Sequence, residues 1–325
     1  MFNIFKSQSW RQNNLPLATG LIITTALLSF IQSCTPAPQT LPLTTPTCTI
    51  APSPMPTATV QISKPSPTLQ PTPTVKFVPP PAIIDIGQMW INSIDGAEMV
   101  GVPAGEFTMG SSDETTAEGP AHLVYIDAFY IDKYEISNNQ YRKCVEAGIC
   151  VKLEKRTSYD DPDFAHHPVV NVTWHWANSY CEWARKRLPT EAEWEKAARG
   201  TDGRRYPSGE EIDCDHAQYK ECGGQTIPVG NLPNGVSPFG AFDMAGNVWE
   251  WVIDEWQEDY YQISPSSNPQ GPSNPRNIQE IHVFRGGSWS EPADLLRSTY
   301  RTWYMPDAQY YNLGFRCVID SPISR

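Results

Sequence analysis

Cysteines are the residues whose spacing most directly suggests chemistry. The chain has eight of them, and six follow residue 100. An even number of cysteines in an exported protein favours disulfide bonds. The alternative is a metal site, but no C-x-x-C pair or histidine cluster has the spacing of zinc ligands. Sequence proximity pairs Cys144 with Cys150 and Cys214 with Cys222, which leaves Cys181 with Cys317.

The first 34 residues are typical of an export signal. Lys6 and Arg11 precede an apolar run, Leu17 to Ile31, that is shorter than a membrane-spanning helix normally needs. Ile31-Gln32-Ser33-Cys34 then resembles the lipobox at which bacterial lipoproteins are cleaved and acylated, although Gln32 is unusual there. The alternatives are an uncleaved anchor and an ordinary secretory signal. All three readings place the rest of the chain outside the cytoplasm, and we expect a lipid on Cys34 to tether a bacterial surface protein to the membrane.

Residues 35–84 are predicted to be a disordered spacer. Between Thr35 and Ala82 the chain has 14 prolines and 11 threonines. Proline removes backbone hydrogen-bond donors and the segment has little apolar material to bury, so it should form an extended, semi-rigid stalk. Cys48, within the spacer, has no obvious partner and receives no function.

The charge of the remaining chain disfavours nucleic acid as a partner. The first 84 residues contain four of the 24 basic residues and none of the 36 acidic ones, which leaves 20 basic against 36 acidic side chains and a formal charge of −16 for residues 85–325. Such a surface repels phosphate backbones. It attracts cations, although most surface carboxylates serve only solubility.

Residues 85–325 read as one α+β domain with little regular secondary structure. Met99–Gly110 predicts two short strands around a Pro/Gly turn, and His122–Ile136 predicts paired strands. Ser137 can cap a helix, Asn138 to Ala147. A second helix begins at Thr173 and carries a core stripe of Trp176, Tyr180 and Trp183; a third, ending near Gly200, begins at the capping box formed by Thr190 and Glu193.

Several separated segments together resemble the formylglycine-generating enzyme, or sulfatase-modifying factor, family, in the family's order over residues 97 to 320. That family has a compact domain related to C-type lectins, and it joins the cysteine of its second helix to its last cysteine, which supports Cys181 with Cys317. The segments are Pro103-Ala104-Gly105-Glu106-Phe107-Thr108-Met109-Gly110, Phe129-Tyr130-Ile131-Asp132-Lys133-Tyr134-Glu135-Ile136-Ser137, Pro168-Val169-Val170-Asn171-Val172-Thr173-Trp174, Lys186-Arg187-Leu188-Pro189-Thr190-Glu191-Ala192-Glu193-Trp194-Glu195, Gly246-Asn247-Val248-Trp249-Glu250-Trp251, Arg285-Gly286-Gly287-Ser288-Trp289 and Asn312-Leu313-Gly314-Phe315-Arg316-Cys317.

The resemblance also implies an enzymatic site that this chain lacks. Active family members oxidise a protein cysteine to formylglycine with two thiols and a copper ion, and those thiols stand third and eighth after the serine of the Arg-Gly-Gly-Ser segment. Here the two positions are Glu291 and Leu296. Copper(I) selects soft thiolate ligands, so we expect no copper and no catalytic residue.

Two other features of the family are implied on this sequence. Ser288 and Asn312 match positions that line the family's substrate groove, and Arg297 and Arg301 offer it basic contacts. The alternative for such residues is structural, with Arg285 and Arg316 paired to core carboxylates and Ser288 holding a turn.

Calcium is the second implied feature. The matching ligands are Asp243 and Glu250 by side chain and Gly246 and Val248 by carbonyl, which suits the preference of calcium for oxygen. The alternative is that Glu250 bonds backbone amides without metal. A second family site would involve Gln218 and Tyr219, but Gln218 stands where an asparagine is usual.

Three functions remain open from the sequence. The first is a non-catalytic, calcium-stabilised binding or scaffolding module, displayed outside the cell as a monomer, with a protein or glycan ligand. The second is a formylglycine-generating oxidase with a relocated active site. The third is carbohydrate recognition, which rests on fold analogy with lectins.

Overall fold

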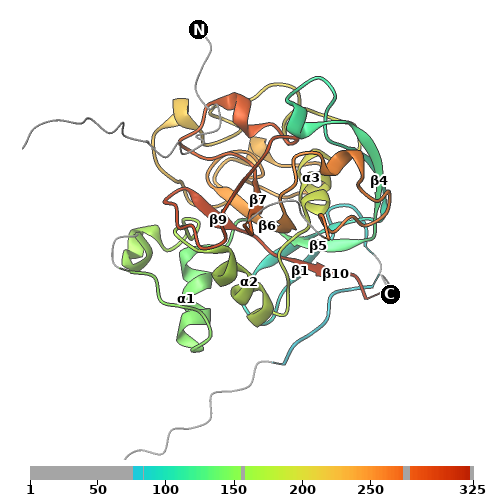
Figure 1. Cartoon of the computed structure of the whole chain (residues 1–325). Helices are drawn as coiled ribbons and strands as arrows, with labels where there is room; N and C mark the ends of the chain where they lie inside the picture. The colour runs from blue at the N-terminus through green and yellow to red at the C-terminus, as the bar shows by residue number, and fades with distance from the viewer. Residues whose placement is uncertain (1–75, 83, 155–157, 274–278, 323–325) are drawn as a thin grey trace, which may run out of the picture. The chain divides into compact units, whose positions relative to one another are not determined.

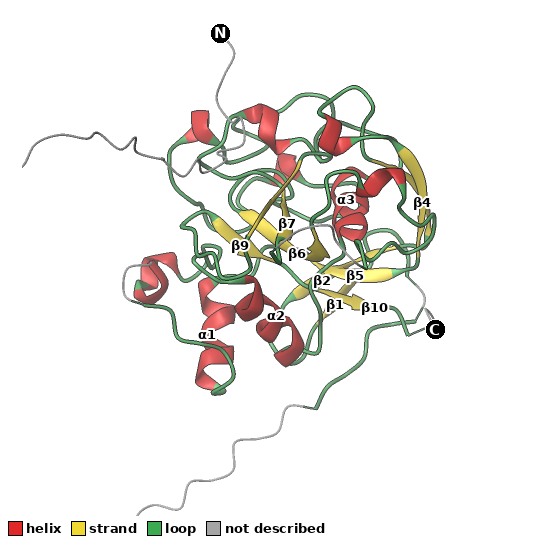
Figure 2. Cartoon of the chain, in the orientation of Figure 1, coloured by secondary structure: helices red, strands yellow, loops and turns green. Residues whose placement is uncertain are grey.

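The computed structural model describes residues 76–82, 84–154, 158–273 and 279–322. The predicted signal and lipidation site, residues 1–34 with Cys34, therefore lie outside the described residues, as does Cys48. Within the described ranges, short helices and strands alternate with long loops (Figure 2). This confirms the predicted α+β domain with little regular secondary structure.

One antiparallel sheet has the strand order β1-β2-β5-β10. These strands are β1 (Met89–Ile91), β2 (Glu98–Val102), β5 (Phe129–Asp132) and β10 (Val318–Asp320). The last strand of the domain, β10, is hydrogen-bonded to β5. This pairing brings the two ends of the domain together (Figure 1).

Two further sheets complete the strand framework. The first is a hairpin of β3 (Gly105–Met109) and β4 (His122–Ile126). The second has the order β8-β7-β6-β9, in which β6 and β9 run parallel and the other pairs are antiparallel. All strands of this second sheet lie beyond Gly200, in a part of the chain for which we predicted no helix or strand. They are β6 (Trp249–Glu255), β7 (His282–Arg285), β8 (Arg301–Tyr304) and β9 (Leu313–Phe315).

The three predicted helices are confirmed with their caps. Helix α1 (Asn138–Glu146) begins at a capping box of Ser137 and Gln140, and α2 (Trp174–Trp183) begins at Thr173. Helix α3 (Glu191–Arg199) begins at the predicted box, in which Thr190 Oγ1 accepts from the amide of Glu193, and ends at Gly200 with φ of 72°. Each cap satisfies amides that the first turn of a helix leaves unbonded. Short 3₁₀ turns occur at Thr116–Glu118, Ser158–Asp160, Pro162–Phe164, Lys220–Cys222, Pro233–Gly235, Tyr260–Gln262 and Ala293–Leu296.

Buried arginine–carboxylate pairs hold the sheet β8-β7-β6-β9 to helix α3. Arg285 on β7 donates to Glu191 and Glu195 at 2.7 Å each, and Arg301 on β8 donates to both oxygens of Glu191 at 2.8 and 2.7 Å. All four side chains are almost completely buried. Removing one partner of such a pair leaves an uncompensated buried charge, which typically costs about 3–5 kcal/mol.

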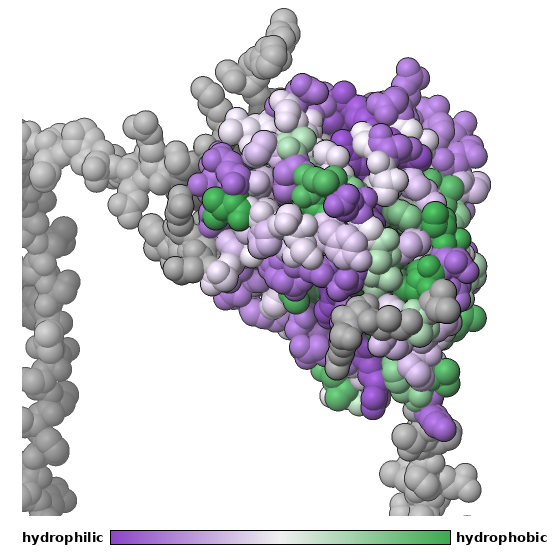
Figure 3. Space-filling view, turned by 90° about the vertical axis from the view of Figure 1, so that its right-hand side faces the viewer, coloured by the Kyte–Doolittle hydropathy of each residue, from purple (hydrophilic) through white to green (hydrophobic). Residues whose placement is uncertain are grey.

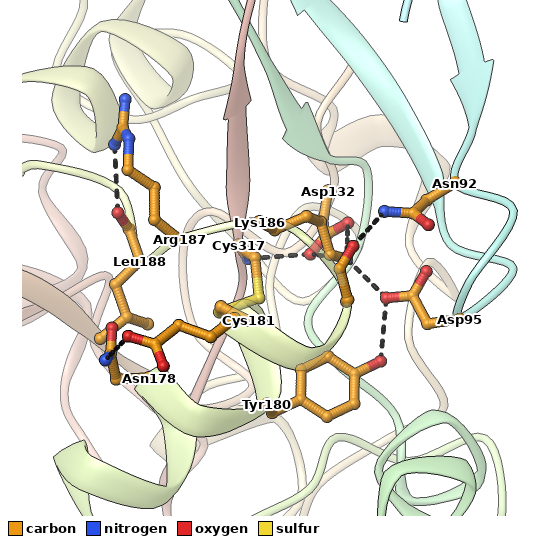
Figure 4. The surroundings of a disulfide bond; sticks show 12 residues. Asn92, Asp95, Asp132, Asn178, Tyr180, Cys181, Lys186, Arg187, Leu188 and Cys317 are labelled. Atoms are coloured by element: carbon orange, nitrogen blue, oxygen red, sulfur yellow. Dashed lines mark hydrogen bonds and ion pairs between the residues drawn. A yellow bond between two sulfur atoms is a disulfide. The ribbon is translucent and has the colours of Figure 1, made fainter. Parts of the chain in front are cut away.

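The three predicted disulfides are confirmed as Cys144–Cys150, Cys181–Cys317 and Cys214–Cys222. Cys181–Cys317 joins helix α2 to the segment before β10, beside a buried charge cluster (Figure 4). In that cluster Lys186 Nζ lies 2.7 Å from Asp132 and 2.6 Å from Asp95, and the Tyr180 hydroxyl donates to Asp95 at 3.0 Å. The stripe residue Tyr180 is fully buried, whereas Trp176 and Trp183 are partly buried against the same core.

The ordered contacts begin earlier than the predicted boundary at residue 85. The ring centroids of Phe77 and Trp90 lie 6.3 Å apart. The Arg185 guanidinium lies 5.3 Å from the centroid of the same Phe77 ring. Ser321 Oγ also donates to the Ala82 carbonyl at 2.9 Å. The end of the predicted spacer therefore packs on the domain, because Phe77 gives this proline-rich stretch an aromatic group to bury.

Hydrophilic residues cover most of the face drawn in Figure 3, and hydrophobic residues form several groups among them. Within the described ranges, no helix combines the length and hydrophobicity required to span a bilayer.

Candidate functional site

Of the two positions that correspond to the family thiols, Glu291 precedes the 3₁₀ turn Ala293–Leu296 and Leu296 is the last residue of that turn. Leu296 is fully buried and packs in a small core with Tyr206, Tyr219 and Ala245. Glu291 is half-buried, and its carboxylate accepts from Ser290 Oγ at 3.2 Å. One position is thus part of the hydrophobic core and the other carries a hard oxygen ligand, so neither can hold copper(I) as a thiolate does.

The structure brings Ser288 and Asn312 together. The Asn312 amide donates to Ser288 Oγ at 3.1 Å and to Ser290 Oγ at 3.0 Å. Ser288 is fully buried, whereas Asn312 and Ser290 are half-buried. The two predicted residues therefore form a small polar cluster at the surface, with Ser290 as a third member that sequence reasoning missed.

Arg297 does not line a groove, and this prediction is corrected. Its side chain is 6% exposed, and its guanidinium donates to Glu118 at 2.8 Å. Arg301 is likewise buried, against Glu191. Arg297 is buried because it pairs with Glu118, which is fully buried and distant in sequence. Burial alone would raise the pKa of Glu118, but this pairing and the Thr299 hydroxyl lower it.

A cleft of about 220 Å³ lies next to the Ser288–Ser290–Asn312 cluster. Trp289 and Tyr311, which are adjacent to that cluster in sequence, line the cleft. Sequence reasoning missed it, since its walls come from separate loops. The lining includes Asn138, His167, Asn171, Gln225, Trp289 and Tyr311.

Asn247 is hydrogen-bonded to segments that form two walls of this cleft. Its side-chain oxygen accepts from the Ile227 amide at 3.0 Å, next to the lining residues Gln225 and Thr226. Its main-chain carbonyl accepts from the Trp289 amide at 2.9 Å. Asn247 is fully buried with φ of 56°, and its side-chain amide donates to Glu135 at 2.6 Å. One buried residue thus connects two walls that are 62 residues apart, from Ile227 to Trp289.

The predicted calcium loop contains two buried carboxylates that differ in the number of hydrogen bonds they already accept. Both oxygens of Glu250 accept from Arg316 at 2.7 Å, and one also accepts from the Trp194 indole at 2.8 Å. Three of the roughly four acceptor sites of the Glu250 carboxylate are therefore already used, which leaves it little capacity to bind a metal ion. Asp243 accepts one bond, from the Gly230 amide at 2.6 Å, and burial raises its pKa to about 6.

A third carboxylate, Glu135, lies behind this loop and accepts from the Val248 amide at 3.0 Å. Burial raises the pKa of Glu135 well above its usual range, and repulsion from Asp243 and Glu250 adds to this. Arg316 interacts electrostatically with all three acids. Within the described ranges, no set of three or more His, Cys, Asp and Glu side chains is arranged to hold a metal ion.

The proposed second calcium region serves the fold. The Gln218 carbonyl accepts from the Asn247 amide at 2.7 Å, and its side-chain amide donates to the Gln225 carbonyl at 2.7 Å. Tyr219 is largely buried. Gln218 thus supports the cleft wall through its side-chain nitrogen and its main-chain carbonyl.

The sulfatase-modifying factor enzyme 1-like domain matches residues 91–321 of the chain. The chain belongs to this family. A serine/threonine-protein kinase pkn1 of Chlamydia caviae is 37% identical over 68% of this chain and 37% of its own length. The chain therefore spans a little over a third of that kinase.

Two further comparisons cover more of the related protein. The formylglycine-generating enzyme of Mus musculus is 31% identical over 69% of this chain and 75% of its own length. The structure of PvdO from Pseudomonas aeruginosa is 28% identical, with a TM-score of 0.63 over 73% of this chain and 99% of its own. The resemblance on which the candidate positions depend is thus confirmed at the level of family and fold.

Proposed function

We propose that this sulfatase-modifying factor domain is a non-catalytic binding module displayed outside the cell. The observation that carries the proposal is the loss of the thiol pair, with Glu291 and the buried Leu296 at the two positions. All six cysteines of the described ranges are in disulfides, so none of them provides a free thiolate for copper. The cleft beside Ser288 and Asn312 gives the domain a place to hold a ligand.

The oxidase alternative is tested directly with the full chain. The protein is incubated with a Cys-x-Pro-x-Arg peptide, copper and oxygen, and the peptide is analysed by mass spectrometry, with the mouse formylglycine-generating enzyme as positive control. We expect no aldehyde product. Aldehyde formation at a rate comparable with the control would overturn the proposal.

A variant pair tests whether the two positions explain the loss. The double variant Glu291→Cys/Leu296→Cys returns two thiols to the family positions and should take up copper(I) that the wild type does not. The single variant Glu291→Cys is the matched control and should not, because one thiolate lacks its partner. Equal copper uptake by wild type and double variant would contradict the reasoning.

Membrane tethering through Cys34 is part of the same proposal. Its support is the apolar run and the Ile31-Gln32-Ser33-Cys34 segment before the proline-rich spacer. Metabolic labelling with an alkyne fatty acid should mark the wild type, and Cys34→Ala should lose the label. An unlabelled wild-type protein that is released into the medium would favour the ordinary secretory signal instead.

Calcium at the 243–250 loop also remains a proposal, in a reduced form. Asp243 and main-chain carbonyls such as those of Gly246 and Val248 are the ligands that we retain, because Glu250 is occupied by Arg316. The excess of buried carboxylates over arginine here supports a cation nearby. Calcium would stabilise the loop and, through Asn247, the cleft.

A further inference from the structure

The cleft beside Trp289 allows the class of ligand to be named. On the basis of the proposed binding function, we propose that this cleft holds one ring of a neutral saccharide, stacked on the Trp289–Tyr311 pair and hydrogen-bonded by the polar side chains opposite. Five features of the cleft support this assignment: its aromatic surface, its free polar atoms, the absence of charged side chains from its described lining, two main-chain amides that are already paired, and its size.

The aromatic surface is formed by two rings that meet at an angle. The centroids of Trp289 and Tyr311 are 5.5 Å apart and their planes are inclined at 47°. Tyr311 is 58% exposed, and Trp289 is half-buried. Tyr and Trp combine an apolar face with a polar edge. They therefore suit a ligand whose ring presents C–H groups on its face and hydroxyl groups at its edge.

Polar atoms around the cleft remain available. Among the described residues, the Asn171 side chain makes no hydrogen bond, and His167 bonds only through Nδ1, to Thr226 Oγ1 at 2.9 Å. Burial lowers the pKa of His167, which keeps the ring neutral near pH 7. A neutral histidine and an asparagine amide both donate and accept, as the hydroxyl groups of a sugar do.

The described lining has no charged side chain. No Asp, Glu, Lys or Arg is among the residues of the described ranges that line the cleft. A phosphate, sulfate or carboxylate ligand would normally find an arginine or lysine there. The described part of the lining therefore matches an uncharged ligand.

Two main-chain amides of the cleft are already paired. The Asn138 amide donates to the His167 carbonyl at 2.9 Å, and the Asn171 amide donates to the Tyr310 carbonyl at 2.9 Å. A peptide that binds as an added strand needs unpaired main-chain groups at a sheet edge. These two amides are therefore not available to an added peptide strand, whereas the side chains of the lining can bind a saccharide.

The size of the cleft agrees with a single ring. Its volume of about 220 Å³ corresponds to the share of about seven water molecules in the liquid. That space accommodates one sugar ring, with the rest of an oligosaccharide outside in solvent.

The test uses the full chain on an array of neutral oligosaccharides ending in glucose, galactose, mannose or N-acetylhexosamine, with sialylated and sulfated counterparts. We expect binding to neutral glycans in preference to acidic ones. The strongest glycan is then titrated by calorimetry against variants. Trp289→Ala should weaken binding about ten-fold or more, since stacking and burial of one aromatic ring are worth that much. Gln225→Ala, an exposed change at the rim, should weaken binding without affecting folding.

Trp303→Ala is the matched control, because Trp303 is 42% exposed on β8 and does not line the cleft. It should bind as the wild type does. The proposal is overturned if no neutral glycan binds, if acidic glycans bind better, if Trp303→Ala loses as much affinity as Trp289→Ala, or if an uncharged peptide competes for the cleft instead. Each of these results leaves the non-catalytic function standing, which only aldehyde formation from the cysteine peptide would overturn.

Discussion

Removal of the disulfide Cys181–Cys317 should destabilise the domain more than removal of either short disulfide. A disulfide stabilises chiefly by limiting the freedom of the unfolded chain, more so for longer loops. Cys181 and Cys317 are 136 residues apart, whereas Cys144 and Cys150 are 6 apart. The loop-entropy relation gives about 5 kcal/mol for the long loop and about 2.4 kcal/mol for the short one.

The double variants Cys181→Ala/Cys317→Ala and Cys144→Ala/Cys150→Ala form a matched pair. Three of the four cysteines are fully buried and Cys150 is 9% exposed, so the cavities left by the lost sulfur atoms are similar. The difference between the variants then isolates loop length. It should be about 2–3 kcal/mol in the free energy of unfolding.

The assay is urea unfolding of both variants and the wild type under non-reducing conditions, followed by near-ultraviolet circular dichroism. Because domains are typically stable by about 5–15 kcal/mol, the long-loop variant should lie near the limit of folding. Equal losses in the two variants, or a larger loss for the short loop, would refute the argument from unfolded-state entropy.

Other perturbations give further tests. Lys186→Met should lower the free energy of unfolding by about 3–5 kcal/mol at pH 8, because it leaves buried acids without their cation. Burial already raises the pKa of Asp132 to about 6, so this loss of stability should shrink as the pH falls to 5 and the carboxylate becomes protonated. A loss that does not depend on pH in urea titrations would contradict this. Calcium at one hundred times its Kd should stabilise the wild type by about 2.7 kcal/mol, which corresponds to a rise of about 5–10 °C in melting temperature. Asp243→Asn should abolish this shift. Identical melting curves with calcium and with EDTA would remove calcium from the proposal. Leu296→Ala should lower the unfolding free energy by about 2–5 kcal/mol, as expected for a core cavity; a loss below 0.5 kcal/mol would mean that Leu296 is not core.

Local features were predictable because their causes are local. The helix caps at Ser137, Thr173 and Thr190 follow from one side chain and the amides two or three residues later. The end of helix α3 likewise follows from Gly200, which adopts φ of 72° without a steric penalty.

The strands beyond Gly200 were not predictable in the same way. Strand β6 is buried along most of its length and pairs with β7 on one side and β9 on the other. A strand that is buried on both faces has no alternation of polar and apolar residues, so the period that marks a half-buried strand is missing.

The sequence by itself determined the missing thiols at Glu291 and Leu296 and an even set of domain cysteines, because residue identity alone decides whether copper has a soft ligand. Only the tertiary structure decided the role of Arg297, whose partner Glu118 is 179 residues away. The same holds for the cleft, whose walls are joined by Asn247. Burial and long-range pairing depend on which loops meet in space, and no local pattern in the chain specifies that.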